Sequence, residues 1–440
     1  MATQELAEQP VGPALQPPER LSPATTEPSL YGRSFWMAFG ANLCATAVMA
    51  LLFRFSDFVT HLGGTEADLG YIVGVGMIGA LCMRLAQGLG VDRFGPRRVW
   101  LLSLVLLAAA SVGHLAIQSL HDPSVYLLQI AIRTALAGAF GASITYISYQ
   151  VPAARTVEVL GSLGSSGFVG IMLGTALGDF VSGGEYVTRS HVDAMFVLCT
   201  ALALAGTFFA WQATTNPVRP PQRQLPPLIP VIMRFHPGVL LLVALAIGIG
   251  LGMPGVFVRP FGEEQGITVL AWFFWTYAPT AFAVRLMTRR FSSIYGVRPM
   301  ILSGLASAVI GSLSLMLVSR GWHFMLPGFF FGFCHALIFP SVTGAGSMRF
   351  PARYRGIGVA LILAMFDLGN LIGAPLGGSL HEMAVRYDLP TWPIVFSTFA
   401  GLLLTIAVTY AVVSGRSQTR PTRRKNRSLR QKSKLDCQLR

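Results

Sequence analysis

Five charged or titratable side chains lie inside long apolar stretches of the sequence, where they could bind a solute or carry a proton. They are Arg54, Asp57, Arg133, His335 and Asp367. If these stretches cross a membrane, each charge costs about 2.5–3.5 kcal/mol on insertion scales and therefore needs a compensating role. A carboxylate in a low-dielectric site can load and release a proton, and a histidine titrates near neutral pH. The five are candidate substrate-binding or proton-coupling residues.

Each candidate also has a purely structural interpretation. Arg54 and Asp57 are three residues apart and could pair with each other or reach the lipid headgroups. Arg133 could hold a structural partner, and Asp367 could cap a local helix kink. His335 could bond to a neighbouring backbone carbonyl rather than sense protons. The sequence leaves these alternatives open.

The sequence contains no recognisable catalytic set. It has no nucleotide-binding Gly-rich loop followed by Lys-Ser or Lys-Thr, no metal-spaced histidine cluster and no nucleophile elbow. Five cysteines occur without a CxxC pair, which argues against metal sites and disulfides; they are Cys44, Cys82, Cys199, Cys334 and Cys437. We expect no enzyme activity, no cofactor and no metal, and an ion or substrate gradient as the energy source.

Composition points to a membrane protein. Hydrophobic residues make up 53% of the chain and charged residues only 12%, against about 25% in soluble domains. The net charge of +14 is uneven, because residues 414–440 hold ten Lys or Arg and one Asp. Charge confined to a tail and short loops argues against nucleic acid binding and for contact with anionic lipid. A specific partner for this tail remains the alternative.

Twelve apolar stretches are long enough to span a bilayer as helices. They lie at about 34–59, 67–88, 99–118, 125–149, 157–182, 192–213, 238–258, 267–287, 299–318, 323–347, 356–380 and 391–413. The sequence therefore predicts an all-α polytopic membrane protein. Residues 1–33 are rich in Pro, Glu and Gln, and we expect a disordered tail rather than a signal peptide.

Arginines alternate between the loops and set the orientation. Alternate loops carry arginines, such as Arg97 and Arg355, while the remaining loops carry mostly acidic residues, such as Glu66 and Asp122. Positive loops stay in the cytoplasm. We expect both termini inside, in the inner (plasma) membrane, and a monomeric protein in the lipid bilayer.

The chain repeats itself at nearly half its length. Arg84, Gly95 and Arg97 recur 201 residues later as Arg285, Gly296 and Arg298, and Gly170, Gly174 and Gly178 recur 199 residues later as Gly369, Gly373 and Gly377. Two homologous six-helix bundles follow, at 34–213 and 238–413, with a cytoplasmic linker at 214–237 and a basic tail at 414–440. Paired repeats with a site at the midplane are typical of transporters.

One loop carries a resemblance to a known family. The stretch "GLGVDRFGPRR" resembles the signature loop between helices 2 and 3 of the major facilitator superfamily, matched by Gly88, Asp92, Arg93, Gly95 and Arg97. The stretches "CHALIFPS" and "FDLGNLIGAPLGG" look like an efflux branch of that superfamily. The helix-4 arginine motif is shifted, and the helix-5 Gly-Pro motif keeps its glycines without the proline.

The resemblance implies two gates around a central cavity lined by helices 1, 4, 7 and 10. At the cytoplasmic face, Asp92 would hold the halves together through Arg353, Arg355 and the start of helix 11. At the outer face, the repeat offset places Arg259 beside Asp57. Both pairs are expected gating contacts.

The expected function is secondary transport of a small polar organic solute (sugar-, drug- or metabolite-like) by alternating access. Proton-coupled efflux, that is antiport, is favoured over uptake. A proton-independent facilitator is one alternative, and a membrane sensor or scaffold that transports nothing is another.

Overall fold

A computed structural model describes residues 31–151, 156–182, 187–215, 228–288, 291–351 and 354–418. The described chain is helical, with no strand among these residues. Eleven helical segments of the described chain are long and apolar enough to cross a membrane. The twelfth expected span corresponds to α10, an 18-residue helix that contains Pro279. The prediction of an all-α membrane protein is confirmed.

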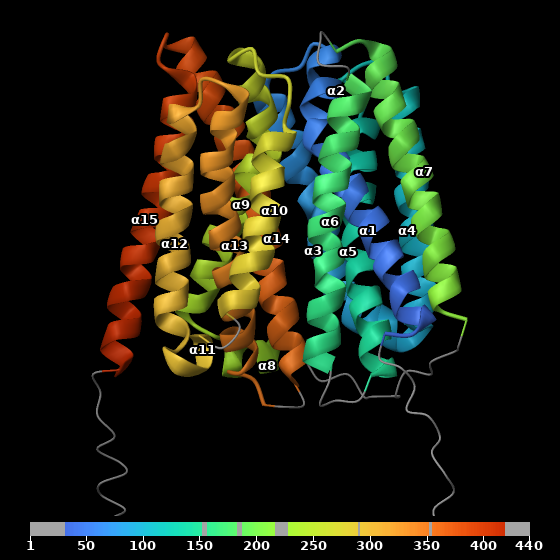
Figure 1. Ribbon diagram of the computed structural model, residues 1–440, viewed down its shortest axis with the longest axis vertical. Helices are drawn as coiled ribbons and strands as arrows, with labels where there is room; N and C mark the ends of the chain where they lie inside the picture. Colours follow the sequence, from blue (N-terminus) through green and yellow to red (C-terminus); the bar gives the residue numbers. More distant parts are fainter. Residues whose placement is uncertain are drawn as a thin grey trace, which may run out of the picture.

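The N-terminal half holds six of these spans, and its helices gather on one side of Figure 1. Its elements are α1 (Arg33–Leu51), η1 (Leu52–Arg54), α2 (Phe55–His61), α3 (Glu66–Phe94), α4 (Pro96–Gly113), η2 (His114–Ala116), α5 (Ser124–Gln150), α6 (Thr156–Ser182) and α7 (Arg189–Ala213). The first expected span is therefore broken by a 3-10 turn that ends at Arg54.

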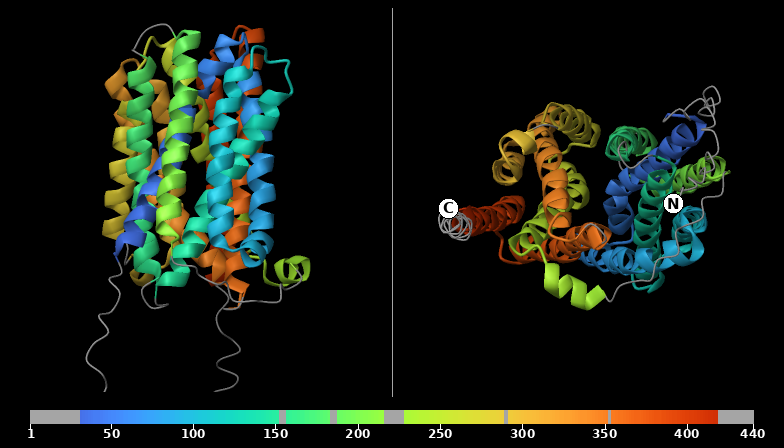
Figure 2. Two further views of the ribbon diagram at one scale, coloured as in Figure 1. Left: turned by 90° about the vertical axis from the view of Figure 1, so that its right-hand side faces the viewer. Right: turned by 90° about the horizontal axis from the view of Figure 1, so that it is seen from below.

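The C-terminal half repeats this order after a short additional helix. Its elements are α8 (Leu228–Phe235), α9 (Val239–Glu264), α10 (Ala271–Thr288), α11 (Phe291–Ile294), α12 (Val297–Ser314), η3 (Leu315–Leu317), η4 (Gly321–Phe324), α13 (Met325–Ser347), α14 (Arg355–Arg386) and α15 (Thr391–Gln418). Helix α8 lies inside the segment expected to be a linker, and Figure 2 shows it at the edge of the bundle, turned across the direction of the long helices.

The repeat extends to the backbone geometry. Gly95 precedes α4 with φ of 80°, and Gly296 precedes α12 with φ of 79°. Only glycine adopts such angles at little cost, so the same residue type recurs at the same turn. The 3-10 turns η2 and η3 that extend α4 and α12 also begin 201 residues apart. These matches confirm two pseudo-symmetric six-helix halves.

The two halves stand side by side, each around its own apolar core (Figure 2). The described chain begins and ends at one end of the bundle, which we call the terminal end; the opposite end is the far end (Figure 1). The most extensive packing between the halves joins α3 to α14. There a Cβ on Gly70 would meet the Ala374 backbone, and one on Gly378 would meet that of Glu66. Helices α6 and α10 form the equivalent contact on the other side.

Candidate functional site

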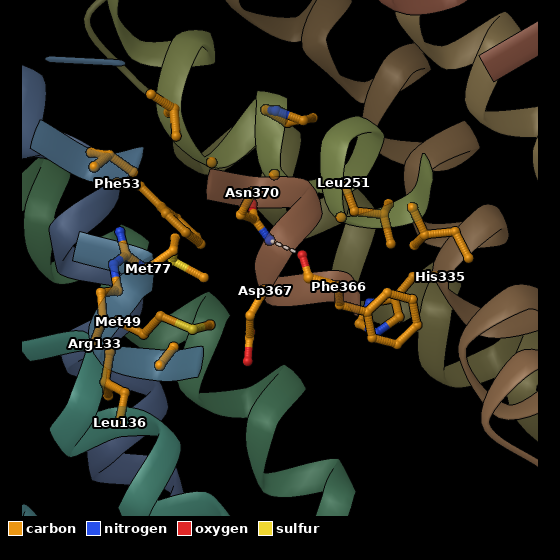
Figure 3. Close-up of a pocket in the computed structure, with 18 of the residues that line it drawn as sticks. Met49, Phe53, Met77, Arg133, Leu136, Leu251, His335, Phe366, Asp367 and Asn370 are labelled. Carbon is orange, nitrogen blue, oxygen red and sulfur yellow. Dashed lines mark hydrogen bonds between the residues drawn. The ribbon is translucent and has the colours of Figure 1, made fainter. Parts of the chain in front are cut away.

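A cavity of about 360 Å³ lies between the two halves. Side chains from α1, α3, α5 and α6 face side chains from α9, α10, α13 and α14 across it (Figure 3). Most of the lining is apolar or aromatic. The polar side chains in the lining are Arg84, Arg133, Tyr277, His335, Asp367 and Asn370. The cavity thus holds three of the five sequence candidates, Arg133, His335 and Asp367.

An ion pair crosses the cavity from one half to the other. Nε of Arg84 on α3 donates to Oδ2 of Asp367 on α14 at 3.0 Å, and the two side chains are 16% and 12% exposed. Asp367 thus has a side-chain partner in the opposite half, a contact that neither interpretation of the sequence had named. Breaking such a pair leaves a poorly hydrated charge behind, so its two members are energetically linked.

Arg133 has no such partner. Its side chain extends from α5 into the cavity beside Met49 and Met77 (Figure 3). Among the described residues no hydrogen bond or ion pair to Arg133 is present, and its Nε is a buried donor left unsatisfied. Asp367 attracts this guanidinium across the cavity but is not within ion-pair distance of it. With Arg84 and Asp367 cancelling, the cavity retains one positive charge.

His335 and Asn370 complete the polar lining. His335 Nδ1 shares a hydrogen bond with the Tyr277 hydroxyl, which links α13 to α10. A neighbouring carbonyl is therefore not the partner of this ring nitrogen. Asn370 Nδ2 donates to the Phe366 carbonyl oxygen at 3.2 Å, four residues earlier on α14 (Figure 3). Each of these side chains therefore has at least one polar atom bonded within the protein.

A second cluster of charges joins the halves toward the far end. Arg259 Nε on α9 lies 2.9 Å from Oδ1 of Asp57 on α2, and these side chains are only 1% and 4% exposed. Arg54 Nε lies 3.1 Å from Oδ2 of the same carboxylate. Asp57 thus pairs with Arg54 in its own half and with Arg259 in the other half at the same time. The sequence had presented these two contacts as alternatives.

Two further carboxylates belong to this far-end network. Asp179 on α6 accepts from Arg54 Nη1 at 3.1 Å and from the Ala271 backbone N–H at 2.8 Å, which ties it to the start of α10. Glu263 accepts from Arg259 Nη2 at 2.6 Å. Three carboxylates face two arginines, so both arginines are compensated.

Aromatic side chains separate this network from the cavity. The rings of Phe53 and Phe274, from opposite halves, stack with centroids 4.6 Å apart and planes at 12°. Both rings line the cavity. Nearer the far-end surface, His381 lies between Glu66 and Glu264, with ring nitrogens 3.5 and 3.0 Å from their carboxylates. These contacts close the far end.

Comparison with known proteins accounts for this architecture. A family model described as Major Facilitator Superfamily matches residues 35–321 and 261–436. The chain belongs to the major facilitator superfamily. The members of this superfamily are transporters.

Solved structures of the superfamily share the fold at low sequence identity. A variant of the nucleoside transporter NupG has a TM-score of 0.73 and 14% identity, over 87% of this chain and 99% of that one. A D-xylose-proton symporter has a TM-score of 0.67 and 16% identity, over 85% and 96%. At these identities the likeness shows the fold alone.

One curated relative matches over a short stretch. A putative tartrate transporter from Agrobacterium vitis is 32% identical over 108 residues, which is 24% of this chain and 22% of the relative. The match therefore spans less than a quarter of the relative's length.

The signature segment of the superfamily is more helical here than expected. Helix α3 continues to Phe94, so Gly88, Asp92 and Arg93 lie on its last turns and the break comes only at Gly95. The side chains of residues 87–93 and all of Arg353 lie outside the described part of the chain. Arg355 is exposed at the start of α14. The expected lock around Asp92 stays a prediction.

Several functional candidates escaped the sequence analysis. Arg84 and Arg285 served only to define the repeat. Their positive charge inside an apolar span could also have indicated a functional site. Asp179 was hidden at the end of a Gly-rich packing motif. His381 lies beyond the expected end of its span, where a titratable side chain has no insertion cost and so does not indicate a site.

Proposed function

We propose that this superfamily transporter moves a small polar organic solute by alternating access, coupled to protons and in the direction of efflux. The observation that carries the proposal is the Arg84–Asp367 pair, which connects the two halves inside the central cavity. A solute or proton that changes this pair changes the contact between the halves. A conformational equilibrium responds only to such differential contacts.

The terminal end is proposed to face the cytoplasm of a plasma membrane. Exposed arginines at this end include Arg98, Arg234, Arg349 and Arg355. The loops at the far end carry carboxylates instead, such as Glu264. This distribution is the one that the positive-inside rule associates with cytoplasmic termini.

In this orientation the structure corresponds to a state that is closed toward the outside. The Asp57–Arg259 pair and the Phe53–Phe274 stack lie between the cavity and the outer surface. Opening outward would require these contacts to break, and the expected lock around Asp92 would form at the other face to compensate. The two sets of contacts would then alternate.

Asp367 is the proposed proton carrier. Protonation would neutralise its carboxylate and dissolve the ion pair with Arg84 across the interface. The halves would then lose one polar contact at the level of the solute. Proton binding and the movement of the halves are coupled through this one contact.

The test uses the purified chain in sealed vesicles that contain a pH-sensitive dye. Radiolabelled uridine, D-xylose, L-tartrate and 3-phenylpropionate are offered with and without a pH gradient. Solute movement with a matching proton signal supports the proposal, and its direction against the imposed gradient identifies efflux by exchange or uptake by symport. Movement without proton flux would indicate a facilitator. No movement of these or of a metabolite mixture would favour the sensor or scaffold.

A further inference from the structure

We propose that the cavity selects an organic monoanion, a single carboxylate on a compact apolar or aromatic body, and that Arg133 receives the carboxylate. This inference rests on the proposed transport function and narrows its substrate class. It follows from the charge balance of the cavity, from the hydrogen-bond partners of the polar lining and from the character of the remaining walls.

The charge balance calls for one negative group. The described lining holds two guanidinium groups, Arg84 and Arg133, and one carboxylate. Asp367 forms its ion pair with Arg84 at 3.0 Å and attracts Arg133 only at longer range, so one positive charge remains unmatched. An unmatched guanidinium in a membrane interior is energetically costly. A ligand that supplies one negative charge would relieve this cost and bind more tightly as a result. A cationic solute would add a second uncompensated positive charge. A dianion would leave a negative excess.

The described lining offers no second carboxylate that could supply that charge. Gln129 lies one turn before Arg133 on α5, with its side-chain oxygen buried and without a hydrogen-bond partner. Even this oxygen does not accept from the guanidinium. A flat guanidinium with free N–H groups matches a planar carboxylate, which it can bind through two parallel hydrogen bonds.

The rest of the lining favours an apolar body over a hydroxylated one. Phe140, Phe339 and Phe366 line the cavity together with Met49 and Met77, the two methionines that flank Arg133 (Figure 3). Methionine sulfur packs well against aromatic rings.

Each uncharged polar side chain of the lining already uses one of its polar atoms in an internal hydrogen bond. Tyr277 and His335 bond to each other, and Asn370 donates to the Phe366 carbonyl. The several hydroxyls of a sugar or of tartrate would find few free partners here. An unmatched polar group in such a site lowers affinity steeply.

The volume agrees with a compact ligand. At about 360 Å³ the cavity lies near the lower end of small-molecule sites, which span roughly 300–1,000 Å³. An arylalkanoate such as 3-phenylpropionate combines the required charge, flatness and size. Its amide has the same shape without the charge, which makes the pair a direct probe of Arg133.

Binding is measured by calorimetry on the full chain in nanodiscs, with 3-phenylpropionate and 3-phenylpropionamide as probes. The acid should bind at least about tenfold tighter than the amide. Arg133→Gln should weaken the acid about 10- to 100-fold, the range of a charged hydrogen bond, and leave the amide unchanged. Arg320→Gln removes one exposed positive charge outside the cavity and should change neither.

Weaker binding could also result from a misfolded variant, so a second variant is chosen that should bind a probe more tightly. Asp367→Asn adds one positive charge to the cavity, so phenylsuccinate, a dianion, should bind this variant at least about tenfold tighter than the unmodified chain. Equal affinity of acid and amide, no effect of Arg133→Gln, or no acid binding at millimolar concentration would each overturn the inference. Acid binding without vesicle flux would instead refute transport alone, and flux of a neutral solute without acid binding would refute only the anion.

Discussion

Phe168 and Asp367 occupy equivalent positions 199 residues apart, and each contacts an arginine from the opposite half. Asp367 pairs with Arg84 at 3.0 Å, whereas the Arg285 guanidinium lies over the Phe168 ring, 5.2 Å from its centroid. Arg84 and Arg285 are themselves repeat partners. One interface between the halves thus carries a carboxylate where the other carries an aromatic ring. The fold is pseudo-symmetric, but its chemistry is concentrated on the α3–α14 side.

A carboxylate at position 168 should stabilise the α6–α10 interface relative to a neutral polar side chain of the same size. In Phe168→Asp, Arg285 gains an anionic partner, and a partly exposed pair contributes up to about 1 kcal/mol. We expect the variant to melt about 1–3 °C above Phe168→Asn, which lacks both ring and charge, in thermal unfolding of the purified chain. Equal melting temperatures of the two variants would show that Arg285 forms no stabilising ion pair with a carboxylate at position 168.

Removing the carboxylate on the other side should uncouple protons from solute. Asp367→Asn keeps the side-chain shape but cannot exchange a proton. We expect its proton signal in vesicles to fall at least about tenfold relative to solute flux. The matched control is Asp193→Asn, because that carboxylate pairs with Arg189 on the surface of α7, away from the cavity. Proton-linked flux that survives in Asp367→Asn would place the coupling group elsewhere.

The far-end network should respond as a unit to loss of the Asp57–Arg259 pair. Asp57→Asn and Arg259→Gln each leave a buried charge without one partner, which costs several kcal/mol in the closed state. Each should raise the rate at which an impermeant thiol reagent, added outside, labels Met49→Cys in a background without native cysteines, by about tenfold or more. The double variant should add less than the sum of the two in free energy.

A simple exchange of the two charges would mislead here. Asp57→Arg would place its guanidinium against Arg54, and Arg259→Asp would place its carboxylate against Glu263, both close neighbours in the structure. Failure of that double exchange would reflect these new repulsions. If the free-energy effects of Asp57→Asn and Arg259→Gln on the labelling rate are fully additive in the double variant, the two residues do not act together as a gate.

Topology can be read from two cysteines. An impermeant thiol reagent should label Cys437, in the basic tail, only when it has access to the cytoplasmic side. Ser119→Cys, in an exposed far-end loop, should be labelled in intact cells whose outer barrier is opened. Cys437→Ser serves as the blank. Labelling with the opposite sidedness would invert the assignment of both gates.

The sequence predicted what depends on local pattern. Apolar length predicted the spans, and the constant offset predicted the repeat, down to the turn before each third span. The same offset placed Asp57 and Arg259 at one depth, and the structure brings them to 2.9 Å. Depth along parallel helices can be inferred from residue counting, because each residue advances an α-helix by about 1.5 Å.

Contacts that depend on helix rotation were not predictable in this way. Arg84 and Asp367 are 283 residues apart, and their pairing requires α3 and α14 to turn particular faces toward each other. Arg133 could not be recognised as unpaired before every neighbour was placed. The continuation of α3 through Gly88 also went against local expectation, because glycine disfavours helix by about 1 kcal/mol and its neighbours must compensate.

The close packing of α3 on α14 has a consequence for how the far end opens. At Gly70 and Gly378 one backbone rests directly on another, with no long side chains that could stretch across a widening gap. Dispersion attraction is short-ranged, and a separation of 0.5–1 Å already forfeits a quarter to a half of it. The attraction between α3 and α14 is therefore weak as soon as the two helices are partly separated. The far end should therefore behave as a latch that is either engaged or released, so that partly open states are scarcely populated.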